Sequence, residues 1–322
     1  MSSGNGQNRF YDDSVRIVNY TGYDQEAYLK WAVPFDIPDR VRSILDDPIL
    51  PCEDGIDLHE TISNISEKIG KNAYLLSADK YNIVSDLLLK HYRCIRTKLI
   101  NAPEIHRFLH PHVTKKARYM LKLVDTPTYR YMFTSLKEVL MQDKIYGSEW
   151  EEFKGSDITT KPILCSPLWD GKRWKCAIVC EYAVGETLHV FRKFPRKIFW
   201  YRQYNKDTVM QILKNVVKTL WCLGYAHNDL SDYNIIFDKN TNDVKIIDFE
   251  SCVQLPDDVV NEFRKEMRKG AKSIEAFYEK YYKYQSLSLL YISEQICCRF
   301  AGDDRCIFNT DDNLLKEAER VL

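Results

Sequence analysis

The chain has 322 residues, enough for one large domain or for two lobes that each bury a hydrophobic core. Lysine plus arginine and aspartate plus glutamate both number 46, so the net charge is zero and gives no overall attraction to nucleic acid or to a membrane surface. No apolar run approaches the roughly 18 residues that a membrane span needs. Residues 1–8 are polar and lack the apolar core of a secretory signal.

The ten cysteines include no Cys-x-x-Cys pair, which argues against a structural zinc site. Several of them lie in apolar segments, where a reduced cysteine packs as a small hydrophobic side chain. We therefore expect a cytoplasmic or nuclear protein.

The first 90 residues predict an N-terminal tail and a helical extension. Residues 10–51 mix aromatic residues with Asp and Pro in no assignable pattern. Apolar residues recur at helical spacing over residues 58–69, between Asp57 as a cap and Gly70 as a stop. A second helix is expected over residues 78–90.

Residues 91–182 predict an antiparallel sheet with one helix. We expect strands over residues 94–100 and 112–124, followed by a helix over residues 134–145. Residues 163–168 and 174–182 then predict a hairpin around an Asp-Gly-Lys turn.

Residues 183–322 predict a helical unit that carries a short hairpin. Apolar residues at helical spacing predict a helix over residues 209–223, which Gly224 ends because glycine readily adopts positive φ. Residues 234–237 and 244–247 predict the two strands of the hairpin. A charged helix over residues 258–269 and an apolar, Tyr-rich segment over residues 276–300 follow.

Three polar groups at fixed offsets predict a phosphoryl-transfer site in this part of the chain. Asp229 is followed by Asn234 five residues later and by Asp248 fourteen residues after that. Phosphoryl transfer needs a carboxylate that orients the accepting hydroxyl, and hard oxygen ligands that hold Mg²⁺ on the nucleotide phosphates. An Asp and an Asn on one loop, with a second Asp at the end of a strand, supply these groups.

The order of helix, loop, hairpin and final Asp resembles the protein-kinase-like superfamily. His227-x-Asp229-x-x-x-x-Asn234 is similar to its catalytic loop, and Asp248-Phe249-Glu250 stands at its Asp-Phe-Gly position. The motifs are notably similar to those of choline/ethanolamine and aminoglycoside kinases and of atypical kinases. The resemblance extends over about residues 92–253 and implies a two-lobed α+β kinase-like fold with an N-terminal helical extension.

The resemblance also implies ATP and Mg²⁺ as cofactors and roles for individual residues. Asp229 would orient the accepting hydroxyl and take its proton, whereas Asn234 and Asp248 would hold Mg²⁺. His227 would support the loop through hydrogen bonds, or would be an ordinary loop histidine.

The small lobe and the hinge would provide the nucleotide contacts. Lys122 would contact the phosphates and Glu138, sixteen residues later, would hold it in place, although Lys98 is a rival if residues 94–100 are the relevant strand. Backbone groups around Glu181 and Tyr182 would bind the adenine at the hinge.

Two departures from the family pattern affect the expected function. No glycine stands between Gly70 and Gly147, so the glycine-rich loop over the phosphates is missing, unless residues 106–112 replace it. Glu250 replaces the usual glycine, and no segment for docking peptides follows. The general resemblance predicts a protein Ser/Thr acceptor, whereas the missing docking segment favours a small-molecule hydroxyl. The missing glycine-rich loop favours the alternative, a catalytically weak or inactive pseudokinase that binds a protein partner.

Two further features have a functional and a simpler interpretation. Residues 191–206 interleave six Lys and Arg residues with six aromatic ones and contain no acidic residue. They could recruit an anionic acceptor, pack as core aromatics with solvated charges, or dock a protein; a nucleic-acid partner is contradicted by the neutral net charge. Three histidines, His106, His110 and His112, fit ordinary loop residues better than metal ligands, since no fourth ligand lies nearby.

Overall fold

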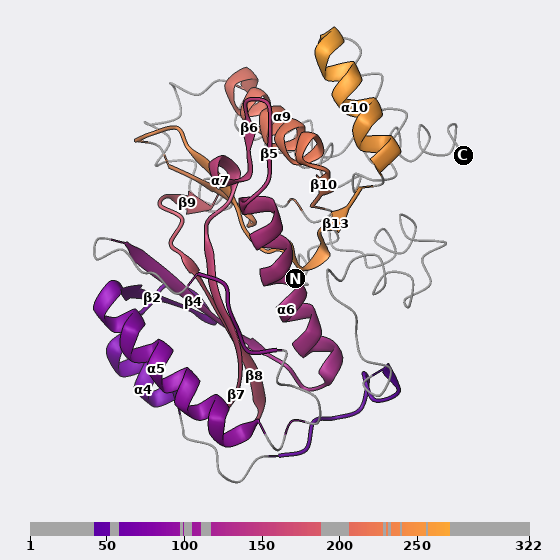
Figure 1. Cartoon of the computed structure of the whole chain (residues 1–322). Coiled ribbons are helices and arrows are strands. Elements are labelled where there is room, and N and C mark those ends of the chain that lie inside the picture. The colour runs from indigo at the N-terminus through magenta and orange to yellow at the C-terminus, as the bar shows by residue number, and fades with distance from the viewer. Residues whose placement is uncertain are drawn as a thin grey trace, which may run out of the picture.

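The computed structural model describes residues 42–51, 58–96, 99, 105–110, 117–187, 206–227, 230, 233–238, 240–255 and 257–270. These residues form two lobes, a small lobe built on a sheet and a large lobe built on helices (Figure 1). The predicted two-lobed α+β architecture is confirmed. None of the helices described combines the length and apolar character needed to cross a membrane.

The small lobe contains a six-stranded antiparallel sheet with the strand order β1-β2-β4-β8-β7-β3. Its strands are β1 (Glu67–Lys68), β2 (Ala73–Ser77), β3 (Arg107–Phe108), β4 (Arg118–Asp125), β7 (Pro162–Trp169) and β8 (Trp174–Glu181). The predicted hairpin of β7 and β8 is confirmed, and its turn places Gly171 at a φ of 88°. A glycine suits this position because side chains with a Cβ rarely adopt positive φ.

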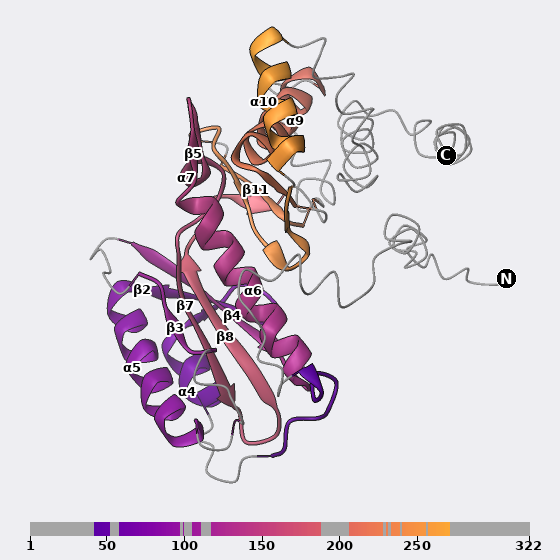
Figure 2. The ribbon, with the colours of Figure 1, turned by 45° about the vertical axis from the view of Figure 1, so that its right-hand side comes forward.

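Helices cover both faces of the sheet, as Figure 2 shows. On one face α4 (Leu58–Ile65) and α5 (Ala78–Ile95) pack against Leu121 and Leu123 of β4, whereas α6 (Tyr129–Tyr146) packs on the opposite face. Side chains alternate along a strand, so Lys122 between the two leucines points to the α6 face. β7 is buried along its whole length because both of its faces are covered.

The second helix of the predicted N-terminal extension is longer than expected and belongs to the small lobe. α5 continues to Ile95 because Tyr92 and Ile95 extend its buried face, so the prediction of a strand that begins at residue 94 is wrong. β2, which precedes α5, pairs directly with β4. Residues 58–95 therefore complete the small-lobe sheet and cover one of its faces.

Residues 42–51, for which the sequence predicts no structure, lie along the start of α6. The main-chain carbonyl of Leu45 accepts the N–H of Arg130 at 2.8 Å, and Pro48 forms a bridge with Thr128. Leu45 and Ile49 are buried beside the helix. Since the first N–H groups of a helix have no partner within the helix, this segment caps α6.

α6 connects the two lobes. Its first half belongs to the small-lobe core with Phe133 and Leu136, and its second half to the large-lobe core with Met141 and Ile145. It continues into the hairpin of β5 (Glu149–Trp150) and β6 (Phe153–Lys154) and then into the short helix α7 (Gly155–Ile158). The large-lobe end of α6 is thus fixed by packing.

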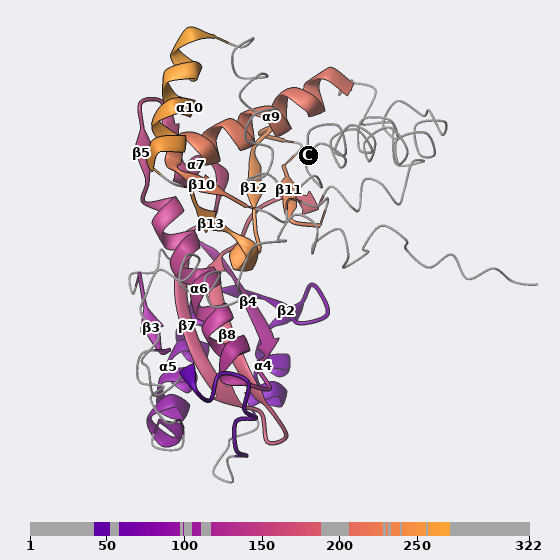
Figure 3. The same cartoon turned by 90° about the vertical axis from the view of Figure 1, so that its right-hand side faces the viewer.

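The large lobe combines α9 (Lys206–Leu223) and α10 (Asp257–Lys269) with short strands. These strands are β9 (Glu186–Thr187), β10 (Tyr225–Ala226), β11 (Ile235–Phe237), β12 (Val244–Ile246) and β13 (Val253–Gln254). The predicted helices and the hairpin β11–β12 are confirmed, and Gly224 ends α9 at a φ of 93°. Figure 3 shows β11 and β12 between α9 and the small-lobe sheet.

Candidate active site

A lysine and two carboxylates from three separate elements meet between the lobes. Nζ of Lys122 on β4 donates to both oxygens of Glu138 on α6, at 2.9 and 3.1 Å. The same ammonium lies 3.1 Å from Oδ1 of Asp248, which follows β12 in the large lobe. Two of these groups stand where the sequence predicts a phosphate-binding lysine and its supporting carboxylate.

The two carboxylates keep Lys122 charged. Burial by itself would lower the pKa of this lysine, but the negative charges of Glu138 and Asp248 outweigh burial and raise it above its ordinary value. Burial raises the pKa of Glu138 to about 7, although the neighbouring ammonium opposes that change. The ammonium of Lys122 therefore offsets part of the cost of burying the Glu138 carboxylate.

Asp248 has a backbone conformation that few side chains adopt. Its φ and ψ are both 69°, in the left-handed region. The N–H of the preceding Ile247 donates to the carbonyl of Asn234 at 3.0 Å, which continues the ladder of β11 and β12. Asn234 and Asp248 consequently lie at the same end of this hairpin, as two ligands for one metal ion must.

His227 supports the same end of the hairpin. Burial lowers the pKa of this histidine to about 4, so its ring is neutral at physiological pH. Nε2 lies 3.1 Å from the carbonyl oxygen of Ile247, and because a carbonyl only accepts, Nε2 carries the hydrogen. The ring also lies against Phe249, with ring centroids 5.0 Å apart. The predicted structural use of this histidine agrees with these contacts.

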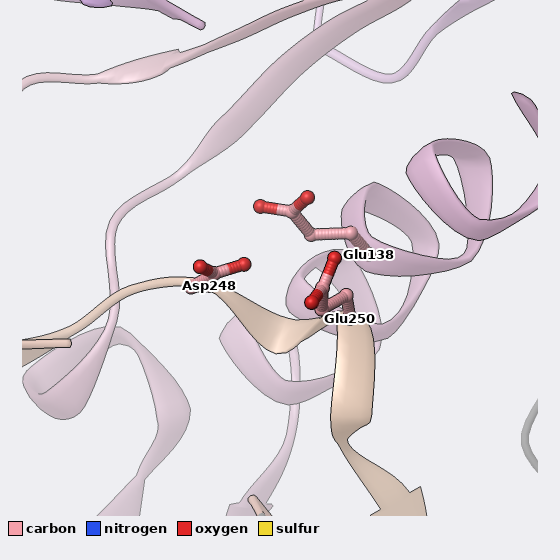
Figure 4. A group of neighbouring side chains, drawn as sticks. All are labelled: Glu138, Asp248 and Glu250. Atoms are coloured by element: carbon pink, nitrogen blue, oxygen red, sulfur yellow. The ribbon is translucent and has the colours of Figure 1, made fainter. Parts of the chain in front are cut away.

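Glu250 adds a third carboxylate to the site. Carboxylate oxygens of Glu138, Asp248 and Glu250 lie within 4.8 Å of one another, and the side chains point toward one another in Figure 4. Carboxylates are the ligands that Mg²⁺ prefers, so the chemistry of this donor set fits the cation. The Lys122 ammonium already neutralises part of the negative charge of these three carboxylates.

The hinge at the end of β8 leads into β9, which pairs with β11, the strand that follows Asn234. The N–H groups of Glu181 and Tyr182 donate to the carbonyls of Lys161 and Arg118, at 2.8 and 2.9 Å. An adenine contact by these two residues would therefore use their carbonyls. Gly185 follows at a φ of 129°, where an added Cβ would lie 2.4 Å from the carbonyl oxygen of Phe237.

The sequence misses one candidate part of the site, the turn between β1 and β2. Residues 70–72, Gly-Lys-Asn, form this exposed turn, and the carbonyl of Asn72 accepts the N–H of Leu123 at 2.8 Å. Ala73 pairs with Lys122 itself. Gly70 appears in the sequence as a helix stop, and the two-residue strand β1 is too short to produce a strand pattern.

The hypothesis that residues 106–112 replace the glycine-rich loop is wrong for the described residues of that segment. β3 lies at the opposite edge of the sheet, separated from β4 by β7 and β8, which is about 14 Å at ordinary strand spacing. His106 is hydrogen-bonded to Ser166, and His110 to Asp143, each at 2.8 Å. Each of these two histidines contacts a different side chain, and the two do not share one binding position.

Several sequence-based predictions lie outside the described residues. They concern the catalytic role of Asp229, the rival lysine Lys98, the loop residue His112, the N-terminal tail before residue 42, the basic and aromatic residues 191–205, and the apolar, Tyr-rich segment over residues 276–300. They stay predictions.

The fold and the site define a protein-kinase-like protein. Residues 177–289, about a third of the chain, match the family model of the RIO domain, an atypical protein-kinase-like family. The match begins in β8 and includes the hinge, the Asp229–Asn234 loop and Asp248. The resemblance to the protein-kinase-like superfamily is thereby confirmed, and at family level it implies an ATP-binding phosphotransferase. No curated protein matches the chain.

Proposed function

We propose that this protein transfers the γ-phosphoryl group of ATP to a hydroxyl in a Mg²⁺-dependent reaction. The observation that carries the proposal is the contact of Lys122 with both Glu138 and Asp248. A scaffold has no physical need to hold a half-buried ammonium between two carboxylates at the junction of its lobes. A nucleotide site does, because the ammonium can contact phosphates while Asp248 holds their cation.

Each described group has a task in this proposal. Lys122 would bind the phosphates, and Glu138 would keep its ammonium in place. Asn234 and Asp248 would hold Mg²⁺, which when bound neutralises charge on the phosphate oxygens. The exposed turn at residues 70–72 is suited to cover the phosphates through the N–H groups of Lys71 and Asn72, whereas the N–H of Gly70 donates to the carbonyl of Ala73 at 3.2 Å. A turn with glycine lets the backbone approach phosphates closely.

Asp229 would orient the accepting hydroxyl and accept its proton. The acceptor would be a protein Ser/Thr or a small molecule. Residues 249–256 support an acceptor that needs no docking segment: they contain the 3₁₀ helix η2 (Phe249–Ser251) and β13, which pairs with β10, before α10 begins at Asp257. That length leaves no room for a loop that binds an extended peptide.

The test is the melting temperature with ATP and EDTA, and with ATP and Mg²⁺. Ligand binding to the folded state stabilises it by about 2.7 kcal/mol at a hundredfold excess over Kd. We expect Mg²⁺-ATP to raise the melting temperature of the wild type, and Asp248→Asn to lose most of the Mg²⁺-dependent part. Asp243→Asn is the matched control, because Asp243 is exposed on the same hairpin.

Transfer from γ-labelled ATP to added hydroxyl compounds and to Ser/Thr peptides then tests the chemistry. We expect Asp229→Asn to abolish transfer while the Mg²⁺-ATP shift remains. No shift at millimolar Mg²⁺-ATP would reject the proposal and favour the pseudokinase alternative.

Recruitment of an anionic acceptor by residues 191–206 is part of the proposal and has its own test. Reversing the charge of Arg192, Lys193, Arg196 and Lys197 should raise KM for an anionic acceptor and leave that for ATP unchanged. If the charge-reversed variant and the wild type have the same KM for the acceptor, this role is removed.

A further inference from the structure

Lys137 is a buried lysine that none of the roles above uses. It precedes Glu138 on α6, and only 2% of its surface is exposed. Nζ donates to the main-chain carbonyl oxygen of Glu250 at 2.7 Å. Burial lowers the pKa of Lys137 to about 8. Because an ammonium is costly to remove from water and a methionine fills a similar volume, packing alone does not account for a lysine here.

The carbonyl that Lys137 binds belongs to the turn that begins at Asp248. This turn continues as η2, in which the N–H of Cys252 donates to the carbonyl of Phe249 at 3.0 Å. Phe249 is fully buried, so one side of the turn is fixed by packing. Lys137 holds the same turn through its backbone.

Asp248 is therefore flanked by two carbonyls that side chains hold. His227 donates to the carbonyl of Ile247 on one side, and Lys137 donates to that of Glu250 on the other. The left-handed backbone of Asp248 is of higher energy than an extended or helical one, and such a conformation persists only when its surroundings enforce it. These two hydrogen bonds are suited to enforce it.

We propose that Lys137 is a positioning residue for Asp248. Its hydrogen bond fixes the turn against α6 and so keeps the Asp248 carboxylate beside Lys122. Lys137 and Glu138 are neighbours on α6. This one helix therefore holds the turn through Lys137 and the ammonium of Lys122 through Glu138. The predicted effect of Lys137 on metal binding rests on the proposed function, whereas its role in holding the turn does not.

The first experiment measures amide hydrogen exchange in the full chain without nucleotide. Lys137→Met removes the donor and keeps the length of the side chain, and Lys144→Met on an exposed position of α6 is the matched control. We expect faster exchange of the N–H of Cys252 in Lys137→Met, with the control unchanged. If Lys137→Met does not fold, Lys137→Leu, which also lacks a donor, takes its place. If the N–H of Cys252 exchanges at the wild-type rate in a folded variant, the proposal is overturned.

The second experiment measures the Mg²⁺ concentration that gives half of the Mg²⁺-dependent melting shift at fixed ATP. Groups that orient a metal ligand typically change metal affinity by about 10–100-fold. We expect an increase of at least about tenfold in Lys137→Met, whereas the shift with ATP and EDTA stays at its wild-type value. An unchanged Mg²⁺ requirement would overturn the positioning role.

The two experiments separate the possible failures. If the wild type shows no Mg²⁺-dependent shift, the proposed function fails, and the exchange comparison still decides whether Lys137 holds the turn. If the wild type shows the shift and Lys137→Met changes neither measurement, only the positioning role of Lys137 fails.

Discussion

Lys122 and Asp248 are 126 residues apart in the sequence, yet Nζ of the lysine lies 3.1 Å from Oδ1 of the aspartate. The lysine belongs to a strand of the small lobe and the aspartate to a turn of the large lobe. Glu138 binds the same ammonium from α6, the helix that connects the lobes. Since three elements contribute, the contact depends on how the lobes pack together.

Lys122→Met should therefore destabilise the protein. It leaves Glu138 buried without its cation, and removing one partner of a buried pair typically costs about 3 kcal/mol. The cost should be lower here, about 2 kcal/mol, because burial already raises the pKa of Glu138 to about 7 and the unpaired acid can take up a proton. Chemical denaturation at pH 7 measures it.

A double-mutant cycle identifies the cause. Lys122→Met together with Glu138→Gln should regain much of the stability that Lys122→Met loses, because no buried charge is then left unpaired. A coupling between the two changes below about 0.5 kcal/mol would mean that the pair makes no energetic contribution.

Gly155 should tolerate no side chain. An added Cβ would lie 1.5 Å from the carbonyl oxygen of Ile145, where the chain after β6 crosses the end of α6. Gly155→Ala must displace one of these segments, and we expect a loss of about 3 kcal/mol or more in the free energy of unfolding. Thermal melting measures the change.

Gly147 is the matched control for Gly155. It follows the same helix, with a φ of −81° and its nearest contact 3.5 Å from the added Cβ. Gly147→Ala should leave stability within about 1 kcal/mol of the wild type or raise it. Similar melting temperatures for the two variants would contradict the close approach at Gly155.

The sequence predicts the elements that hold Lys122 and Asp248 because each has a local signal. β12 and the helix before the catalytic loop have clear apolar patterns, and Gly224 marks where that helix ends. The spacing of Lys122 and Glu138 indicates a strand followed by a helix. Their mutual contact still requires the fold, since no local pattern encodes a distance between two lobes.

Other parts of the site have no sequence signal of their own. The turn at residues 70–72 is missed because β1 has only two residues and its pairing with β2 is a tertiary property. Lys137 is a charged residue next to an expected functional one, and nothing local shows that it is buried. The strand expected at residue 94 fails because Ile95 suits a helix and a strand equally well until its partners are known.

Ile49 should stabilise the start of α6. It is 7% exposed in the small-lobe core, its N–H donates to the carbonyl of Pro127, and it belongs to the segment that caps the helix. Ile49→Ala should lower the free energy of unfolding by about 2 kcal/mol, because it removes buried methyl and methylene groups. Its neighbour Leu50 is 78% exposed, so Leu50→Ala should change stability by less than about 0.5 kcal/mol. Denaturant unfolding compares the two, and equal effects would contradict the docking of this segment.

His227 should make the protein less stable in acid. Burial lowers its pKa from 6.5 to about 4, so between these values the unfolded chain binds more protons than the folded protein. Above pH 6.5 the ring is neutral in both states and does not lower the free energy of unfolding. As the pH falls from 6.5 toward 4, protonation in the unfolded chain lowers this free energy progressively. The difference between the two pKa values corresponds to about 3 kcal/mol.

His227→Gln keeps an amide donor for the Ile247 carbonyl but removes the titrating group. The loss of unfolding free energy between pH 7 and pH 4.5 should therefore be smaller in this variant than in the wild type, by about 2–3 kcal/mol. His106, whose pKa burial also lowers to about 4, should make a second contribution that is removed by His106→Gln. Because carboxylates titrate in the same range in all three proteins, only the differences between them are interpreted. If His227→Gln loses as much unfolding free energy as the wild type, the His227 ring takes up a proton in the folded wild-type protein. The neutral Nε2–H donor assigned to this ring would then be wrong.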